Sequence, residues 1–199
     1  KVSSVEIVAG EQKETDYYLD PAVSYLDEVV VSAEKYEEKL QNIPVAISAF
    51  TSREIAEFRI WNLQEITGLV PNLYSSNPGD NRNATSIRGI GTTSYDPAVA
   101  TYVDGVNQFN LDTYIPQLTD VERIEVLRGP QGTLYGRNAM GGVINVITKK
   151  PGNKTDAFVE LNAGNFGQQR YTAGFKSPLI TGKLFLGVAL QYQSRKGYF

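Results

Sequence analysis

The sequence contains no cysteine and no histidine. Without cysteine the chain has no disulfide framework, no thiolate zinc site and no cysteine nucleophile. Without histidine it lacks the usual general base and the commonest transition-metal ligand, which excludes a Ser-His-Asp triad. No pair of carboxylates is singled out for acid-base catalysis. We therefore expect that the chain is not an enzyme, and we expect neither a cofactor nor a metal site.

Long apolar runs and a strong excess of one charge are also missing. No apolar run reaches the length of a membrane-spanning helix, and no secretory signal is visible at Lys1. The formal net charge of −3 gives no general reason to bind nucleic acid. The 199 residues, 41% hydrophobic and 21% charged, resemble an ordinary globular composition with room for one or two packed domains.

The composition changes along the chain in a way that predicts four regions. Residues 1–19 hold a short strand signal followed by a charged turn, and residues 20–42 are a polar linker around the apolar residues Val29, Val30 and Val31. Residues 43–151 have a mixed α/β pattern, and residues 152–199 read as successive strands. The abrupt end after a strand pattern predicts that the chain is a truncated piece of a longer protein.

The mixed region begins with a strand at residues 45–50, where Thr51 or Ser52 then caps a helix with Glu54 in its first turn. The expected buried side of this helix consists of Ile55, Phe58 and Ile60. A second helix at residues 62–68 stops before Pro71. Short strands are predicted at residues 86–88, 100–103, 124–127 and 143–147.

The last region alternates apolar and polar residues over 157–164, 169–176 and 183–195, with turns at 165–167 and 177–182. Either a soluble antiparallel sheet or a lipid-facing barrel gives such alternation. The third strand has five consecutive apolar positions on one face: Leu184, Leu186, Val188, Leu190 and Tyr192. Its opposite face carries glutamine, arginine and glycine, which suit a wet lumen. The alternation alone leaves both architectures open.

The most specific signal is the run at residues 120–151, DVERIEVLRGPQGTLYGRNAMGGVINVITKKP. Its glycines do not form a phosphate loop, because no Gly-Lys-Ser/Thr follows them. The run closely resembles the end of the plug domain of TonB-dependent outer-membrane receptors. Residues 43–48, 86–91 and 101–106 match the same family in the same order, so the resemblance covers roughly residues 26–199.

The resemblance implies an α+β plug domain, a mixed sheet with short helices, at residues 43–151. It implies that residues 152–199 are about the first three antiparallel strands of a transmembrane β-barrel, in contact with outer-membrane lipid. In this family the plug lies inside the barrel of a Gram-negative outer membrane, facing the periplasm. It blocks the barrel, binds substrate and is moved by the periplasmic protein TonB. Residues 1–19 faintly resemble the end of a carboxypeptidase-regulatory-like domain.

Residues 26–33 resemble the energy-coupling box of the same family. The box residues are Asp27, Glu28, Val29, Val30, Val31, Ser32 and Ala33. Such a β-rich island also fits a structural strand of the plug. The resemblance implies that it pairs edge to edge with a strand of TonB, so that backbone hydrogen bonds carry the binding. A charged flank, Glu34 to Lys39, is expected to be mobile and to keep the box accessible.

Arg88 and Arg128 each stand before a glycine at a predicted strand end. These two residues are either ordinary surface arginines or part of a lock between plug and barrel. The predicted lock also includes Glu125. The resemblance implies that such arginines pair with glutamates of the barrel wall, which would lie beyond Phe199. The guanidinium group suits this role because it binds carboxylates through two parallel hydrogen bonds.

Three loops, at residues 75–83, 92–97 and 108–114, are expected to form the plug apices that face substrate. Solvated loops without a ligand role are the alternative. The candidate contacts are Asn77, Asp80, Arg82, Tyr95, Asp96, Phe109, Asn110 and Tyr114. Within the resembled family a ferric siderophore or another metal chelate is the expected cargo. Sugar importers tend to follow the box with Gly-Tyr-Gly, whereas this chain has Glu34-Lys35-Tyr36. Cobalamin and haem remain open, and the rival function is a soluble periplasmic plug-like binding module.

Overall fold

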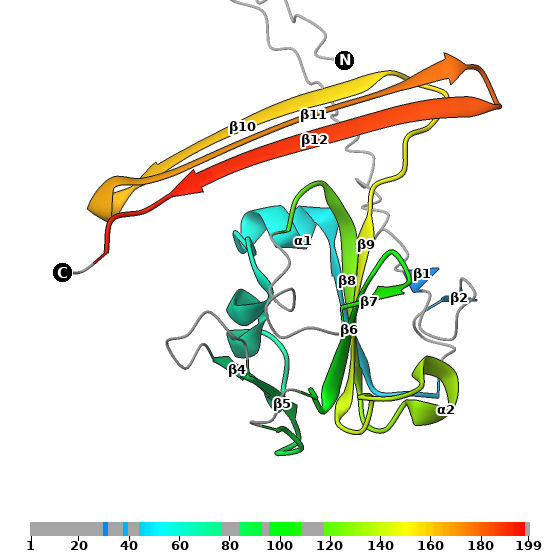
Figure 1. Cartoon of the computed structure of the whole chain (residues 1–199), viewed down its shortest axis with the longest axis vertical. Helices are drawn as coiled ribbons and strands as arrows, with labels where there is room; N and C mark the ends of the chain where they lie inside the picture. Colours follow the sequence, from blue (N-terminus) through cyan, green and yellow to red (C-terminus); the bar gives the residue numbers. More distant parts are fainter. Residues whose placement is uncertain are drawn as a thin grey trace, which may run out of the picture.

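The computed structural model describes residues 30–31, 38–39, 44–76, 84–92, 96–108 and 118–197. These residues form a mixed sheet with short helices, and three long strands that lie across one end of it (Figure 1). The helices are α1 (Ser52–Glu57), η2 (Leu63–Gly68), α2 (Gly132–Tyr135) and η3 (Asn165–Gly167). The strands are β1 (Val30–Val31), β2 (Glu38–Lys39), β3 (Ile47–Thr51), β4 (Leu73–Ser76), β5 (Ala84–Ile87), β6 (Val99–Val103), β7 (Val106–Asn107), β8 (Val121–Arg128), β9 (Gly142–Thr148), β10 (Asp156–Gly164), β11 (Gln168–Ile180) and β12 (Leu184–Ser194).

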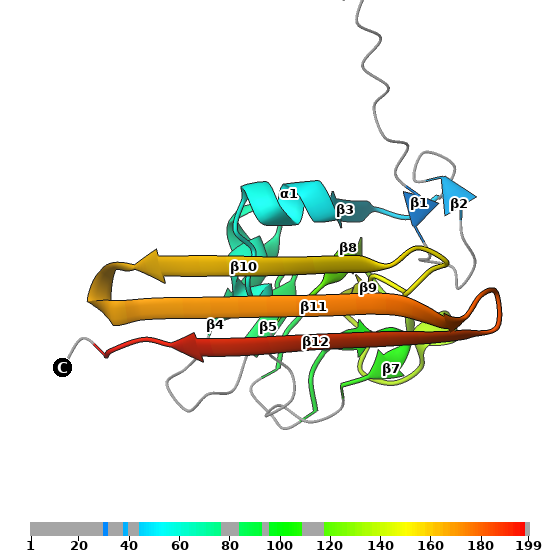
Figure 2. The same ribbon diagram turned by 90° about the horizontal axis from the view of Figure 1, so that it is seen from above.

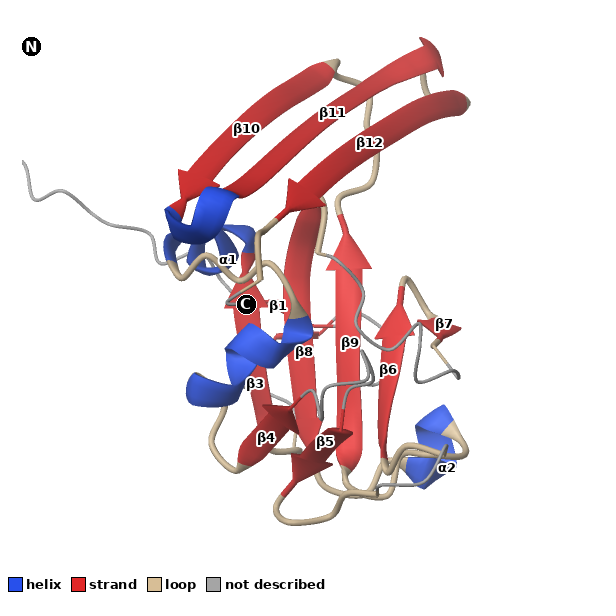
Figure 3. Ribbon diagram, turned by 60° about the vertical axis from the view of Figure 1, so that its left-hand side comes forward, coloured by secondary structure: helices blue, strands red, loops and turns tan. Residues whose placement is uncertain are grey.

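The central sheet has five strands in the order β3-β8-β9-β6-β7 (Figure 3). Only β6 and β9 run parallel, so the sheet is mixed. Strands β8 and β9 are buried for most of their length, although the polar residues Glu125 and Asn145 interrupt their apolar sequences. All four strands predicted from residues 86 to 147 are present, and the short strand β4, which pairs with β5, was not predicted.

Two apolar clusters cover opposite faces of the central sheet. The larger cluster lies on the side of α1 and η2, with Ile60, Leu63, Ile66, Ile124 and Ile144 among its buried members. The smaller one lies on the side of β1 and α2 (Figure 1). It consists of Val31, Ala100, Leu127, Tyr135, Ala139 and Val143. The second cluster therefore brings a residue of the N-terminal linker into contact with the mixed domain.

Helix α1 begins as the sequence predicts. Thr51 is its N-cap, and a reciprocal pair of hydrogen bonds links Thr51 and Glu54. The prediction that Phe58 is buried is wrong, because its side chain is 55% exposed. The helix ends at Glu57 and the chain turns at Arg59, whose φ is 52°, so that Ile60 points inward and Phe58 outward.

The second predicted helix is confirmed as the 3-10 helix η2, capped by the side chain of Asn62. Among the described residues, no helix is both long and apolar enough to cross a membrane.

Strands β10, β11 and β12 form a separate antiparallel sheet, the C-terminal sheet, which lies across the central sheet (Figure 2). The turn at residues 165–167 is confirmed. The predicted turn at 177–182 is too long, because Ser177 and Pro178 still pair with Leu186 and Phe185. An irregularity between Pro178 and Ile180 accommodates the proline, which has no N–H to donate. The expected fold class, a mixed sheet with short helices followed by antiparallel strands, is confirmed.

Candidate functional site

The segment predicted as the coupling box is represented by Val30 and Val31, which form β1. This strand pairs antiparallel with β2, so that Val30 lies opposite Lys39 and Val31 opposite Glu38. Asp27, Glu28, Val29, Ser32 and Ala33 lie outside the described residues. The last two residues of the charged flank therefore take part in the ladder with the box.

The side chain of Val31 is fully buried in the smaller apolar cluster. The other buried residues of this cluster come from β6, β8, β9 and the α2 region, and are far from Val31 in sequence. Val45, Ile47 and Ala49 are half-buried against the same cluster. The expectation that the box is accessible is therefore wrong for Val31 in this state of the molecule. Burying a valine contributes about 1.5–3 kcal/mol, which is enough to hold a short strand in place.

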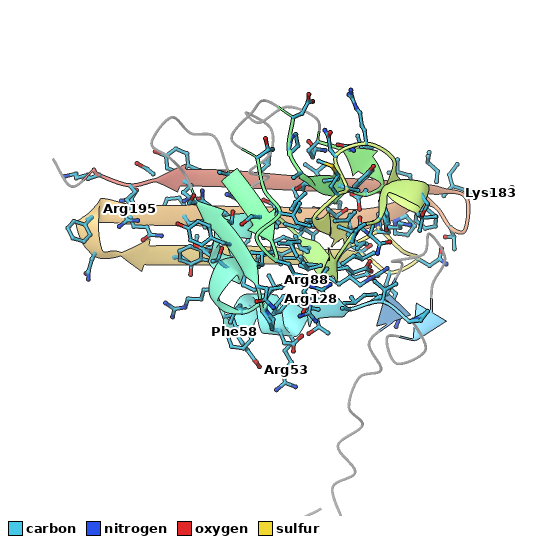
Figure 4. All side chains as sticks on the ribbon, turned by 90° about the horizontal axis from the view of Figure 1, so that it is seen from below. Arg53, Phe58, Arg88, Arg128, Lys183 and Arg195 are labelled. Carbon is cyan, nitrogen blue, oxygen red and sulfur yellow. The ribbon has the colours of Figure 1, made fainter. Side chains whose placement is uncertain are left out.

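Arg88 and Arg128 lie side by side at one end of the central sheet (Figure 4). A Cβ at Gly129 would lie 3.5 Å from Nη1 of Arg88, and Arg88 itself has a left-handed φ of 53°. Nε of Arg128 is buried and has no hydrogen-bond partner among the residues that the structure describes. Within the described part of the chain, no carboxylate forms an ion pair with either guanidinium group. The neighbouring guanidinium groups of Arg88 and Arg128 therefore have no carboxylate partner among the described residues.

Glu125 lies in the middle of β8 and is fully buried. Its carboxylate accepts hydrogen bonds from Nε of Arg123 at 2.8 Å and from Nδ2 of Asn145 at 3.2 Å. Arg123 and Asn145 both belong to the central sheet. These two bonds therefore lie inside the mixed domain, and a part for Glu125 in a lock to a barrel wall stays a prediction.

Tyr135 connects this buried carboxylate to the cluster around Val31. Tyr102 donates a hydrogen bond from its hydroxyl to the backbone oxygen of Tyr135 at 2.6 Å, and the two rings meet edge to face. Burial, and then the nearby charge of Glu125, raises the pKa of Tyr135 to about 12. The Tyr135 hydroxyl therefore stays neutral at physiological pH.

The C-terminal sheet has two faces of opposite character. Successive side chains of a strand point to opposite faces. Arg170, Thr172 and Lys176 of β11 are buried against the central domain, whereas Tyr171 and Phe175 are exposed. The exposed apolar side chains of the same outer face are Val159, Leu161, Leu184, Leu186, Val188, Leu190 and Tyr192. The polar face is covered and the apolar face is bare, the reverse of a sheet packed on an apolar core.

Polar side chains of the inner face bond to the segment that precedes β8. Nη2 of Arg170 donates to the backbone oxygen of Leu118 at 2.9 Å, and Lys176 forms an ion pair with Asp120. Arg170 and Lys176 belong to no motif in the sequence and are not among the predicted site residues. Arg170 and Lys176 occupy the polar positions of an alternating strand, and that period-two pattern was the available signal.

A cleft of about 550 Å³ separates α1 from β10 and β11. Ile55, Arg59 and Trp61 line it from the central domain, and Glu160 and Thr172 line it from the C-terminal sheet. Oγ1 of Thr172 is buried and has no hydrogen-bond partner in the described residues. The inner face of the sheet is thus polar both where it touches the central domain and where it does not.

Most of the predicted substrate contacts lie outside the described residues: Asn77, Asp80, Arg82, Tyr95, Phe109, Asn110 and Tyr114. Asp96 is described and exposed. The flanking hairpin of β4 and β5 borders an open groove of about 480 Å³, lined by Tyr74, Ser76, Thr85 and Thr92. Ser75, at the start of the first predicted loop, instead belongs to β4 and is buried.

Comparison with known proteins identifies relatives that match most of the chain. The family model of the TonB-dependent receptor plug domain matches residues 39–143, just over half of the chain. The pesticin receptor of Yersinia pestis is 33% identical over 173 residues, which cover 85% of this chain and 26% of the receptor. The iron-regulated outer membrane virulence protein of Vibrio cholerae is 33% identical over 172 residues, covering 80% and 26%.

A vitamin B12 transporter of Vibrio vulnificus is also 33% identical, over 153 residues that cover 72% of this chain and 24% of the transporter. Among solved structures, the ferric yersiniabactin uptake receptor from Yersinia pestis superposes with a TM-score of 0.70 at 33% identity, covering 74% and 24%. The chain spans about a quarter of the length of these curated relatives. By name the relatives are receptors and transporters, in agreement with the prediction that the chain is not an enzyme.

Proposed function

We propose that this chain, which belongs to the TonB-dependent outer-membrane receptors, is the gating part of an active transporter. In this proposal residues 43–151 are the plug, residues 152–199 are the first strands of the barrel wall, and residues 26–33 are the coupling box. Residues 1–19 lie outside the described residues, and a regulatory-like domain there stays a prediction.

The observation that carries the proposal is the polarity of the C-terminal sheet. Its polar face packs on the plug and its apolar face is bare along β10, β11 and β12. A transmembrane barrel strand has this pattern, with apolar side chains toward lipid and polar ones toward the lumen. The same face counts against the rival soluble module, because soluble proteins rarely expose such a large contiguous apolar surface.

The proposed cargo is a ferric siderophore. It is supported by the likeness to a ferric yersiniabactin uptake receptor and to an iron-regulated outer-membrane protein. A vitamin B12 transporter matches at the same identity, so cobalamin is the alternative. Uptake of radiolabelled iron and of labelled cobalamin by cells that carry the full-length receptor distinguishes the two. Cobalamin uptake without iron uptake would reject the siderophore.

The coupling role rests on the short strand β1, which already pairs through its backbone in the plug. We expect Val30→Pro to abolish binding of the receptor to the periplasmic domain of TonB, because proline removes a backbone N–H from the pairing strand. Val30→Ala is the matched control, since it keeps that N–H. Equal TonB binding by the purified Val30→Pro and Val30→Ala receptors would remove the coupling role from this strand.

The lock role of Arg88 and Arg128 is supported by the buried, unpartnered Nε of Arg128. In the full-length receptor we expect Arg128→Ala to loosen the plug by about 3–5 kcal/mol, because an opposing wall carboxylate would remain buried without its partner. The readout is the rate at which protease cleaves the plug. Arg53→Ala is the control, since Arg53 is exposed and pairs with Glu57 on the surface of α1. Protease resistance equal to that of the control would reject the lock.

A further inference from the structure

The three residues that precede β8 are bound by side chains of the C-terminal sheet. Arg170 donates to the backbone oxygen of Leu118, and Lys176 pairs with Asp120. Between these contacts, the hydroxyl of Thr119 donates to Oε1 of Gln191 on β12. Residues 118, 119 and 120 are therefore each held by a different polar side chain of the sheet.

Burial makes these contacts strong. Arg170 is only 3% exposed, and its guanidinium group lies 5.3 Å from the centre of the Trp61 ring. Gln191 and Glu160 accept further hydrogen bonds from Arg170, at 3.2 and 3.5 Å. The side chains of Lys176 and Asp120 are each at most one-tenth exposed. Buried charges persist only when paired, and removing one partner is strongly destabilising.

Residues 118–120 and the proposed coupling strand lie at opposite ends of β8 and β9. Val121, the first residue of β8, pairs with Thr148 at the end of β9, and the N–H of Lys149 donates to the backbone oxygen of Asp120. The contacts thus lie beside the covalent connection to the C-terminal sheet. Val31 packs at the opposite end of the same two strands, against Leu127 and Val143.

We infer that Arg170 and Lys176 form a clamp that fixes residues 118–120 of the plug to the wall while the coupling strand acts on the other end. The inference rests on the proposed function. Its polarity is opposite to that of the predicted arginine lock, because here the cations belong to the sheet and the acceptors to the plug. The clamp defines the part of the plug that keeps its place when the coupling strand is pulled.

The ion pair is tested by a double-mutant cycle in the full-length receptor. Lys176→Met and Asp120→Asn each leave one buried group without its partner, and we expect each to raise the rate of plug proteolysis roughly tenfold or more. Asparagine is chosen because Asp120 has a left-handed φ of 55°, which asparagine tolerates. The double variant removes both charges and should return most of the way to wild type. If the two single changes act independently, the proteolysis rate of the double variant is raised by the product of their two factors. That result overturns the clamp.

The fixed position is tested by cross-linking in cells that carry the receptor. These 199 residues contain no cysteine, so Thr119→Cys with Gln191→Cys gives one thiol pair within them, across the clamp. A short bifunctional thiol reagent should join them without loss of energised iron uptake. Val31→Cys with Ala139→Cys, both in the smaller cluster, is the matched pair whose cross-link should stop uptake.

Two results overturn the clamp: failure of the first pair to cross-link, or loss of uptake when it does. Uptake by the wild-type receptor in the same cells separates this outcome from failure of the proposed function. If the wild-type receptor imports nothing, the transport proposal fails. If it imports normally and only the clamp variants depart from expectation, the clamp alone fails.

Discussion

Val31→Asp is expected to release β1, the proposed coupling strand, from the plug in the absence of cargo. The wild-type side chain is fully buried among Leu127, Tyr135 and Val143. A carboxylate cannot remain in that apolar cluster without a partner. Since burial of a valine contributes about 1.5–3 kcal/mol, its loss should raise the fraction of receptors with a free strand roughly 10- to 100-fold.

The first measurement is the affinity of the substrate-free receptor for the periplasmic domain of TonB, which should rise with that fraction. The second is tryptic cleavage after Lys39, which lies opposite Val30 in the β1–β2 ladder. Val106→Asp is the matched control, because Val106 is 64% exposed on β7. Cleavage and affinity unchanged from the control would mean that Val31 does not retain the strand.

Gly142→Ala is expected to destabilise the central sheet of the plug more than any surface change. Gly142 opens β9 with a φ of 153°, which side chains rarely adopt. A Cβ there would lie 2.3 Å from the backbone oxygen of Leu127 and 2.8 Å from Cδ1 of Ile87. Backbone strain and overpacking together should cost about 3 kcal/mol or more.

Hydrogen exchange of the β8 and β9 amides in the full-length receptor measures this loss. Gly152→Ala is the control, because a Cβ at Gly152 meets nothing within 4 Å and its φ is ordinary. We expect exchange in the Gly142→Ala plug to be faster by roughly a hundredfold, and exchange in the control to be unchanged. Equal protection in the two variants would show that the strands can separate enough to admit the methyl group.

Elements that depend on neighbouring residues could be predicted from the sequence. The Thr51–Glu54 capping box predicts the start of α1. The alternation of apolar and polar residues in β11 and β12 predicts the two faces of the C-terminal sheet. The accessibility predicted for the box failed at Val31 because the contacts of Val31 are mostly long-range. Val31 is buried by residues about 70 to 110 positions later in the chain, which no pattern around residue 31 reveals.

In the candidate site, too, residues with a local sequence signal were predicted and residues defined by long-range contacts were not. Adjacent glycines marked Arg88 and Arg128, and the structure brings these two together. Arg170 and Lys176 carried only the signal of a polar strand face, and their partners at residues 118–120 lie in a segment without a motif. Glu125 was grouped with the lock by its position in the motif, but its partners are set by strand register, which places Asn145 directly across from it.

In the proposed function, the strand at Val30 and Val31 couples this plug to an external source of energy. The most direct measurement is energised iron uptake by cells that carry the full-length receptor as wild type, Val30→Ala or Val30→Pro, at equal receptor levels. We expect uptake near wild type for Val30→Ala, and for Val30→Pro uptake no higher than in cells without the receptor. Undiminished uptake by the Val30→Pro receptor would mean that this strand does not couple the plug to energy.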